Sequence, residues 1–483
     1  MSEWLRRLSR PISELVERRA VIGSEAEPLL GLVGRMREAG ESVALITDLH
    51  GRIAGVLTAE DLLERALFAL EPHQPVAAAL RRRAPALHEQ DRIYHAIAEM
   101  RRQRRNCLPV VDATGRPLGL IRYESLVGSS FAGLLAQLDS AVPGESRPPS
   151  GAKTVQASLA AALLAAGEPV MEVITLVNAL NDDIAAVVLR QAIASMAEVG
   201  WGEPPVPFAV LVMGSAGRGE SLLHPDQDNG FIFADHADNA QENIDRFFAE
   251  LAKRFTHGLD QAGFALCAGD VMATNPLWRK ALAQWQAQVT GWVRSRGNQE
   301  IMFTDIFFDF RAVDGSAELA AALRRHVTVA ARDNVPFLAQ ISWLQHERAS
   351  SVDLFGQLLA KDGPEKDAID LKLRGTKPLV EVVRLLALKN GIETTGTPAR
   401  LAALAEAGLL AQEDADMLND DLVYLLERLL HTQINRIAAG RVPDNCVKPE
   451  LLSRAERDRL VQIFRDIDRW RQHLVTEYFP GLA

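Results

Sequence analysis

The chain has 483 residues, of which 48% are hydrophobic and 24% are charged, as in ordinary globular proteins. This length exceeds what a single hydrophobic core usually organises and favours about three domains. The formal net charge of −10 argues against general nucleic-acid binding, because contacts with phosphates require a basic surface.

The cysteines and the apolar segments indicate the compartment. The three cysteines are widely spaced and form no zinc-binding or disulfide pattern, which fits a reducing environment. The first residues lack the apolar stretch of a signal peptide, and no apolar run is long enough to cross a bilayer. We therefore expect a cytoplasmic protein without a membrane partner.

An internal repeat occupies the region from about residue 15 to residue 128. Segments 43–48 and 51–57 have the pattern of a strand, a turn and a second strand, and segments 107–112 and 115–121 repeat that pattern. Helical patterns precede and follow each copy. Because one such unit cannot bury its own sheet, we expect the two copies to pack against each other.

The repeat resembles a pair of cystathionine-β-synthase-type (CBS) domains, and we assign residues 1–130 to it as a regulatory domain. Such pairs usually sense adenosine nucleotides and often dimerise, so the resemblance implies AMP or ATP as a ligand and allows a homodimer. The ribose- and phosphate-binding signature is present in the first copy as Thr58 and Asp61. The second copy has Arg122 and Ser125 at these positions and lacks the carboxylate.

A structural reading of the same signature stays open. Thr58 has the properties of a cap for the following helix, and Asp61 would lie in the first turn of that helix, where a negative charge is favourable. Capping and ligand binding can coexist, so the sequence does not separate the two interpretations.

A second domain is expected at residues 155–325, after a Pro- and Gly-rich linker at residues 131–154. It begins with helical patterns at Ser158–Ala166 and Val170–Glu198. The apolar run Val210–Met213 then ends abruptly at a glycine, as a buried strand does when it enters a tight turn.

The turn after this strand is rich in glycine. Gly214, Gly217 and Gly219 allow the backbone to approach a ligand, because they have no Cβ. Exposed backbone N–H groups, with Ser215 and Arg218 beside them, suit a polyphosphate.

Asp226 and Asp228 follow the glycine turn on an extended segment. Residues i and i+2 of a strand point to the same side, so both carboxylates can bind the same divalent cation. Hard oxygen ligands of this kind suit Mg²⁺ or Mn²⁺.

The spacing of the turn and the two aspartates carries a second resemblance. The residues concerned are Gly214, Ser215, Gly217, Arg218, Glu220, Asp226 and Asp228. Together they resemble the nucleotidyltransferases of the DNA polymerase β superfamily, in particular the branch that contains the uridylyltransferase of the PII signal protein. The resemblance is closer still to a family of proposed signal-transduction nucleotidyltransferases with CBS repeats.

This superfamily places a third carboxylate on a strand beside the one that carries the two aspartates. Residues 301–311 are predicted to form such a strand, because polar and apolar side chains alternate along it. Asp309 is the preferred candidate and Asp305 the second. The alternative interpretation is a structural ion pair between Asp309 and Arg311.

The C-terminal region, residues 326–483, is predicted to be a helical bundle, and the resemblance of the following segment implies that this bundle binds the substrate. Its segment 369–378 resembles the C-terminal domain of the same family. Lys372, Arg374 and Lys377 would then face the triphosphate or the acceptor. The alternative is a charged turn that caps a helix.

The sequence thus predicts an α+β multidomain protein with a CBS pair, a polymerase β-like α/β domain and an all-α bundle. The resemblance implies a set of carboxylates that bind two Mg²⁺ or Mn²⁺ ions and are catalytic, namely Asp226, Asp228 and Asp309. It also implies that the triphosphate lies against Gly214, Ser215, Gly217 and Arg218.

The predicted function is transfer of a nucleoside monophosphate from an NTP to an acceptor hydroxyl, in the manner of a protein uridylyl- or adenylyltransferase. The expected acceptor is a regulatory protein in signal transduction, with adenine nucleotide acting at the CBS pair; a small-molecule acceptor stays open. One alternative is a non-catalytic, nucleotide-sensing signalling protein. Another is a purely structural interaction protein, which the intact phosphate turn disfavours.

Overall fold

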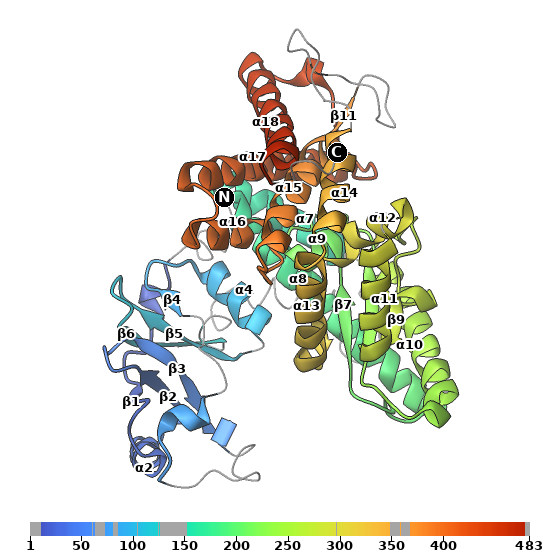
Figure 1. Ribbon diagram of the computed structural model, residues 1–483. Coiled ribbons are helices and arrows are strands. Elements are labelled where there is room, and N and C mark those ends of the chain that lie inside the picture. The colour runs from blue at the N-terminus through green and yellow to red at the C-terminus, as the bar shows by residue number, and fades with distance from the viewer. Residues whose placement is uncertain are drawn as a thin grey trace. The chain divides into compact units, whose positions relative to one another are not determined.

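The computed structural model describes residues 11–59, 61–62, 73–80, 86–103, 105–123, 125, 152–295, 297–347, 358 and 368–478 (Figure 1). The chain divides into two compact units. One comprises residues 1–140 and 165–168, and the other comprises residues 141–164 and 169–483. Most of the predicted linker, residues 131–151, lies outside the described residues.

The first unit contains two three-stranded sheets of the same topology. The strands of the first sheet are β1 (Val21–Ser24), β2 (Val43–Thr47) and β3 (Ile53–Thr58). Those of the second are β4 (Leu87–His88), β5 (Cys107–Val111) and β6 (Pro117–Arg122). In each sheet the first strand is parallel to the second, and the second is antiparallel to the third. This equivalence confirms the predicted repeat.

Helices connect the first two strands of each sheet. They are α2 (Leu29–Ala39) and α4 (Ile93–Gln103), with short 3-10 turns at η1 (Ile12–Glu14) and η2 (Val76–Ala79). Val43, Leu45 and Val56 of the first sheet form one buried cluster with Cys107 and Leu120 of the second. The two copies therefore share a core, as expected for units that cannot bury a sheet alone.

A four-stranded sheet with the order β10–β7–β8–β9 organises the second unit. Its strands are β7 (Phe208–Val212), β8 (Asn229–Phe233), β9 (Arg279–Ala281) and β10 (Arg311–Gly315). β7 is antiparallel to both β10 and β8, and β9 is parallel to β8. The glycine turn joins the two central strands, as predicted.

The helices around this sheet include α7 (Ala152–Ala165), α8 (Val170–Glu198), α9 (Gly214–Arg218), α10 (Gln241–Gln261), α11 (Leu282–Ser295), α12 (Asn298–Phe307) and α13 (Ala317–Arg332). Two 3-10 turns are η3 (Asp238–Ala240) and η4 (Pro276–Trp278). Val188 of α8 and Phe248 and Phe255 of α10 share a buried cluster with Val210 and Phe231 of the strands. The apolar sides of α8 and α10 thus cover one face of the sheet.

The strand predicted at residues 301–311 is wrong: the segment is helical through Phe307, and β10 begins only at Arg311. Phe303 and Phe307 are spaced four residues apart, as on one face of a helix, and both pack against Trp292. Phe307 also stacks on Trp285, with 4.5 Å between ring centroids. This aromatic packing outweighs the alternation, so Asp305 and Asp309 do not share the face of a strand.

The C-terminal region is helical, as predicted. Its helices are α14 (Val335–His346), α15 (Lys377–Lys389), α16 (Thr397–Glu406), α17 (Gln412–Ala438) and α18 (Arg454–His473). Shorter elements are the π-helical turns η5 (Lys372–Thr376) and η7 (Leu474–Tyr478), the 3-10 turn η6 (Pro449–Leu451), and the antiparallel strands β11 (Ile369–Asp370) and β12 (Cys446–Val447). Residues 378–388 of α15 are all buried, which makes α15 the central helix. No helix in the described ranges could cross a membrane.

Candidate active site

A pocket of about 550 Å³ lies between the glycine turn and the C-terminal helices of the second unit. The predicted residues that line it are Gly214, Ser215, Arg218, Asp226 and Asp228. The C-terminal helices contribute further residues, among them Lys372, Lys377 and Arg384. The structure therefore brings the turn, both aspartates and a cationic segment to one cavity.

Gly214 fixes how closely the turn approaches the aspartates. Its φ is +56°, in the region that favours glycine, and a Cβ there would lie 3.0 Å from Oδ2 of Asp228. The N–H of Met213 donates to the carbonyl of Asp228 over 2.9 Å. The turn thus leaves β7 directly over the start of β8, and any larger residue would press on the carboxylate.

Gly217, which was predicted to hold phosphate, has a different role in the structure. A Cβ on Gly217 would lie 1.6 Å from the main-chain oxygen of Asp309, so this glycine allows two backbones to touch. It is buried and does not line the pocket, and its carbonyl accepts a 3.0 Å hydrogen bond from the Thr395 hydroxyl. The predicted role of Gly217 is therefore corrected to packing.

Asp226 and Asp228 face the same pocket in different environments. The side chain of Asp226 is 48% exposed, and its Oδ2 lies 3.6 Å from Nζ of Lys372. Burial raises the pKa of Asp228; a hydrogen bond from Cys267 opposes this, and the charge of Asp226 adds to it. Burial and Asp228 raise the pKa of the Cys267 thiol to about 11, so the thiol stays a neutral donor.

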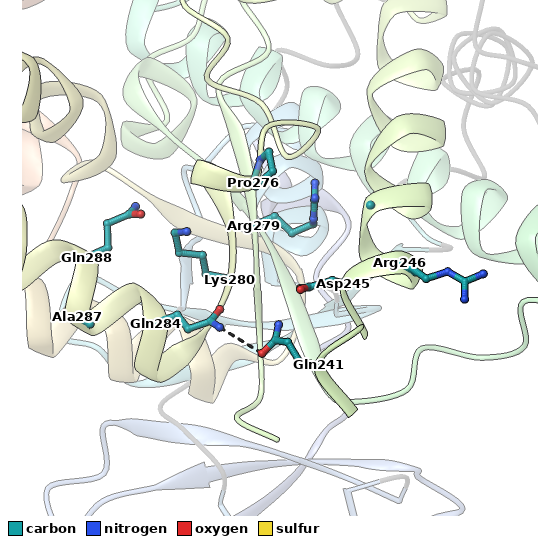
Figure 2. A pocket seen from close by; sticks show the side chains of 10 residues that line it. Gln241, Asp245, Arg246, Pro276, Arg279, Lys280, Gln284, Ala287 and Gln288 are labelled. Carbon is teal, nitrogen blue, oxygen red and sulfur yellow. Dashed lines mark hydrogen bonds between the residues drawn. The ribbon is translucent and has the colours of Figure 1, made fainter. Parts of the chain in front are cut away.

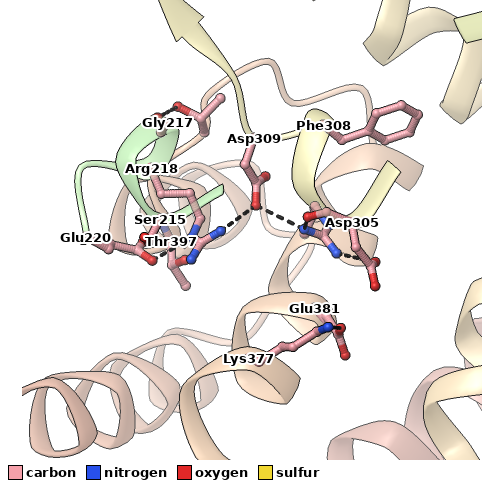
Figure 3. A network of polar contacts seen from close by, with 12 residues as sticks. Ser215, Gly217, Arg218, Glu220, Asp305, Phe308, Asp309, Lys377, Glu381 and Thr397 are labelled. Atoms are coloured by element: carbon pink, nitrogen blue, oxygen red, sulfur yellow. Dashed lines mark hydrogen bonds and ion pairs between the residues drawn. The ribbon is translucent and has the colours of Figure 1, made fainter. Parts of the chain in front are cut away.

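Asp309, the predicted third metal ligand, is fully buried among arginines (Figure 3). Its Oδ1 accepts from Arg400 over 2.7 Å, and its Oδ2 accepts from Arg218 over 2.8 Å and from Arg384 over 3.0 Å. Burial alone would raise the pKa of Asp309, but the three guanidinium groups, Arg400 first, hold it far below its ordinary value. Because arginines occupy both carboxylate oxygens, the assignment of Asp309 as a metal and catalytic ligand is corrected.

The alternative pairing of Asp309 with Arg311 is also wrong. Arg311 forms a two-pronged ion pair with Asp182 of α8, with both N–O distances at 2.8 Å. Asp305, the second candidate, lines the pocket, and its Oδ1 accepts from Arg384 over 2.6 Å. Neither candidate therefore offers an uncommitted carboxylate.

The donor set that remains fits one type of metal site. Among the described residues, no group of three or more His, Cys, Asp or Glu side chains is arranged to hold a metal ion. Mg²⁺, however, is commonly held by one or two carboxylates together with water and substrate phosphates. Asp226 and Asp228, open to a cavity with cationic walls, fit that arrangement.

Arg218 is held in place from two sides. Its Nε donates to Glu220 over 2.6 Å, and Glu220 in turn accepts the N–H of Thr397 at the start of α16 over 2.7 Å (Figure 3). Together with the Asp309 contact, these bonds fix the guanidinium at the edge of the pocket. The turn and the C-terminal helices are thus parts of one polar network.

Two of the three cations predicted in segment 369–378 reach the pocket. Lys372 and Lys377 line it, whereas Arg374 does not. Nζ of Lys377 lies 3.8 Å from the carboxylate of Glu381. Reasoning from the sequence missed Arg384, although a single arginine in the apolar stretch of α15 was a signal that it has a partner.

In the first unit, Thr58 and Asp61 bond to each other. Both the hydroxyl and the N–H of Thr58 donate to Oδ2 of Asp61, over 2.8 and 3.0 Å, and the N–H of Asp61 donates to the hydroxyl over 3.0 Å. This is the capping arrangement. In the second copy, Arg122 pairs with Glu17 at 2.9 Å and with Glu41 at 3.2 Å.

Comparison with family models matches three regions of the chain. Residues 76–130 match a CBS domain, residues 154–299 match the model described as "Putative nucleotidyltransferase DUF294", and residues 336–478 match the substrate binding domain described for such nucleotidyltransferases. A comparison with curated proteins found no match.

Solved structures of CBS proteins are similar to about a quarter of the chain. A CBS domain pair/ACT domain protein from Thermotoga maritima is 23% identical, with 26% of this chain and 98% of that chain covered and a TM-score of 0.23. A CBS domain protein from Pyrobaculum aerophilum, solved with AMP, is 20% identical, with 27% and 98% covered and a TM-score of 0.24.

Proposed function

We infer that this chain, which belongs to the DUF294 nucleotidyltransferases with a CBS domain, transfers a nucleoside monophosphate from an NTP to an acceptor hydroxyl with the help of Mg²⁺. One observation supports this proposal above the others: Asp226 and Asp228 open into the same pocket as the glycine turn and two lysines of the C-terminal helices. Such a pocket has acceptors for a cation and donors for a triphosphate.

The metal would be held by Asp226 and Asp228. When bound, Mg²⁺ would neutralise charge on the phosphates and lower the pKa of the acceptor hydroxyl. The raised pKa of Asp228 indicates that the negative charge of this carboxylate is not fully balanced by the protein alone. A carboxylate that binds a cation is expected to have this property, because the cation would supply the missing positive charge.

The remaining polar side chains act on the triphosphate. Ser215 and the start of α9 present hydroxyl and N–H groups, and Arg218 is fixed beside them by Glu220 and Asp309. Lys372 pairs with Asp226 in the free protein, so the arrival of a metal–NTP complex would release its ammonium group to the phosphates.

We extend the proposal to the acceptor and to regulation. The expected acceptor is a hydroxyl of a regulatory protein in the cytoplasm, modified by a uridylyl or adenylyl group. Adenine nucleotide at Thr58 and Asp61 would modulate the reaction, and the CBS pair would allow a homodimer. A bound ribose would take over acceptor sites of Asp61 that now bond to Thr58.

A second candidate function is nucleotide sensing without catalysis. The observation that favours it is the burial of Asp309 under three arginines, which leaves two carboxylates where the superfamily uses three. A site with fewer acidic ligands binds fewer metal ions and supports weaker activation of the acceptor.

The decisive experiment uses the full-length protein with each α-³²P-labelled NTP, Mg²⁺ and an extract of the source cells. Transfer of label to a protein band in the wild type, with none for Asp228→Asn, supports the enzyme. Saturable NTP binding without transfer to any protein or small-molecule acceptor supports the sensor. Absence of both transfer and NTP binding would refute the two proposals together.

A further inference from the structure

A second pocket, of about 790 Å³, lies on the sheet domain and shares no lining residue with the candidate active site (Figure 2). The residues used below are Gln241, Asp245 and Arg246 of α10, Arg279 and Lys280 of β9, and Gln288 of α11. The pocket is therefore built by two helices and the strand between them in the chain.

The position of the pocket follows from the sheet order. β9 is an edge strand, next to β8 only. Consecutive strand residues point to opposite faces, and Figure 2 shows Arg279 and Lys280 on different sides of β9. Because both line the pocket, it wraps around the free edge of the strand.

The free edge of β9 is not suited to pairing with another strand. The N–H of Arg279 donates to the carbonyl of Pro276, and the N–H of Ala281 donates to the side chain of Gln284 over 3.1 Å. Local partners thus satisfy the N–H groups that an added strand would need. The ligand must be recognised by side chains.

Cations dominate these side chains, although the whole chain has a net charge of −10. Arg246, Arg279 and Lys280 line the pocket with a single carboxylate, Asp245. The guanidinium of Arg279 donates to the carbonyls of Ala273 and Thr274, which fix its position without neutralising its charge.

The side chain of Lys280 has no ion pair or hydrogen bond within the described part of the chain, whereas its backbone belongs to the ladder between β8 and β9. Burial lowers the pKa of this lysine, the charge of Arg279 lowers it further, and Asp245 opposes both effects. A half-buried ammonium without an ion-pair partner, beside a fixed guanidinium, is stabilised by an anion.

We propose that this edge pocket is a second ligand site, for a small phosphate-bearing molecule that lies across the free edge of β9, with Arg279 on one side of the strand and Lys280 on the other. Arginine offers a planar fork of donors and lysine a compact charge, and together they balance a phosphate dianion. Gln241 and Gln288 also line the pocket. The amide of Gln241 accepts from Gln284 over 3.3 Å and that of Gln288 donates to the carbonyl of Leu277 over 3.1 Å, which leaves the nitrogen of Gln241 and the oxygen of Gln288 for the rest of the ligand.

The test uses lysine acylation of the full-length protein, read residue by residue with mass spectrometry. The acylation rate of Lys280 is followed as pyrophosphate, ribose 5-phosphate or AMP is titrated. Lys372 and Lys377 report on the active-site pocket in the same samples, and the exposed Lys253 of α10 is the control for nonspecific effects. Ribose 5-phosphate and AMP separate a general phosphate site from a nucleotide site.

The expected result is saturable protection of Lys280 with a midpoint different from that of Lys372 and Lys377, and unchanged labelling of Lys253. Arg279→Gln should raise the midpoint about tenfold or more, since one charge-assisted contact is lost. Arg246→Gln removes another positive charge from the pocket, on an exposed side chain, and leaves the bonds of Arg279 to Ala273 and Thr274 intact. This variant should raise the midpoint less than Arg279→Gln does. Labelling of Lys280 that stays constant or falls in parallel with Lys253 would overturn the proposal.

Discussion

Nη1 of Arg400 lies 2.7 Å from Oδ1 of Asp309, although the two residues are 91 positions apart in the chain. Both side chains are buried, so the contact joins the segment before β10 of the four-stranded sheet to α16 of the C-terminal helices. Arg218 and Arg384 complete the shell around the same carboxylate. Asp309 is thus the centre of the polar network under the pocket.

Replacement of Asp309 by asparagine should destabilise the protein, by about 3–5 kcal/mol, because three buried guanidinium groups lose their common counter-charge. The measurement is the free energy of unfolding of the second unit, obtained by urea titration of the full-length chain. Asp182→Asn weakens the pair with Arg311, whose side chains are 28% (Arg311) and 23% (Asp182) exposed, and should cost less, about 1 kcal/mol, as the matched control. A variant Asp309→Asn with wild-type stability but weaker Mn²⁺ binding would instead restore Asp309 as a metal ligand.

The change Asp228→Asn should abolish nucleotidyl transfer, by several orders of magnitude, while the fold remains intact. The carboxylate is already costly in its buried position, as its raised pKa indicates, so the melting temperature should not fall. Activity and thermal unfolding are measured together. The exposed Asp238→Asn is the control outside the pocket; equal activities in the two variants would contradict the assignment.

Lys372→Gln should have opposite effects on two ligands. Without the ammonium 3.6 Å away, Asp226 should bind Mn²⁺ more tightly in the absence of nucleotide, whereas NTP affinity should fall about tenfold. Electron paramagnetic resonance measures free Mn²⁺, and calorimetry measures NTP binding. Arg374→Gln, in the same π-helical turn but away from the pocket, should change neither value. A parallel loss of both affinities would indicate a general structural role for Lys372.

Thr58→Val separates capping from nucleotide binding in the first unit. Loss of the hydroxyl removes the bonds to and from Asp61 and should cost about 1 kcal/mol of unfolding free energy. AMP affinity, measured by calorimetry, should fall in addition. Thr58→Ser keeps the hydroxyl and should restore both properties; unchanged AMP affinity in Thr58→Val would leave the cap as the sole function of this residue.

Asp421 makes stability depend on pH in the C-terminal helices. Burial raises its pKa to about 6, against the opposing charge of Arg459 and with a contribution from Asp466. Because this pKa is above the unfolded value, the carboxyl favours folding below about pH 4, and that contribution is lost as the pH rises through about 6. Asp421→Asn should therefore be more stable than the wild type at pH 8 by about 1–3 kcal/mol, with the difference vanishing near pH 4, as measured by chemical unfolding. A difference that grows toward low pH would contradict this assignment.

The features that the sequence reveals are local ones. The strand, the glycine turn and the pair Asp226 and Asp228 are close in sequence, so spacing alone places them on one pocket. The same holds for the CBS repeat, where each copy carries its own strands and turn. Local hydrogen bonds and periodicity are sufficient to predict such units.

Tertiary contacts decide the features that the sequence does not reveal. Arg384 and Arg400 meet Asp309 from 75 and 91 positions away, and no spacing rule connects residues so distant. Segment 301–311 alternates like a strand, but Phe303 and Phe307 also fit a helix, and packing against Trp292 favours the helix. Gly217 looks like a phosphate-binding glycine, yet the neighbouring backbone of Asp309 explains why no side chain is present there.

The contacts of Arg384 and Arg400 have a practical consequence for anyone who wishes to shorten the protein. A fragment cut after α13 would retain Asp309 and Arg218 while discarding two of the three arginines around that carboxylate. Its interior would keep Asp309 with one of its three arginine partners, Arg218, and the separated C-terminal helices would carry two buried arginines without their counter-charge. Neither piece is suited to independent expression, so residues 152–478 are best produced as one indivisible polypeptide.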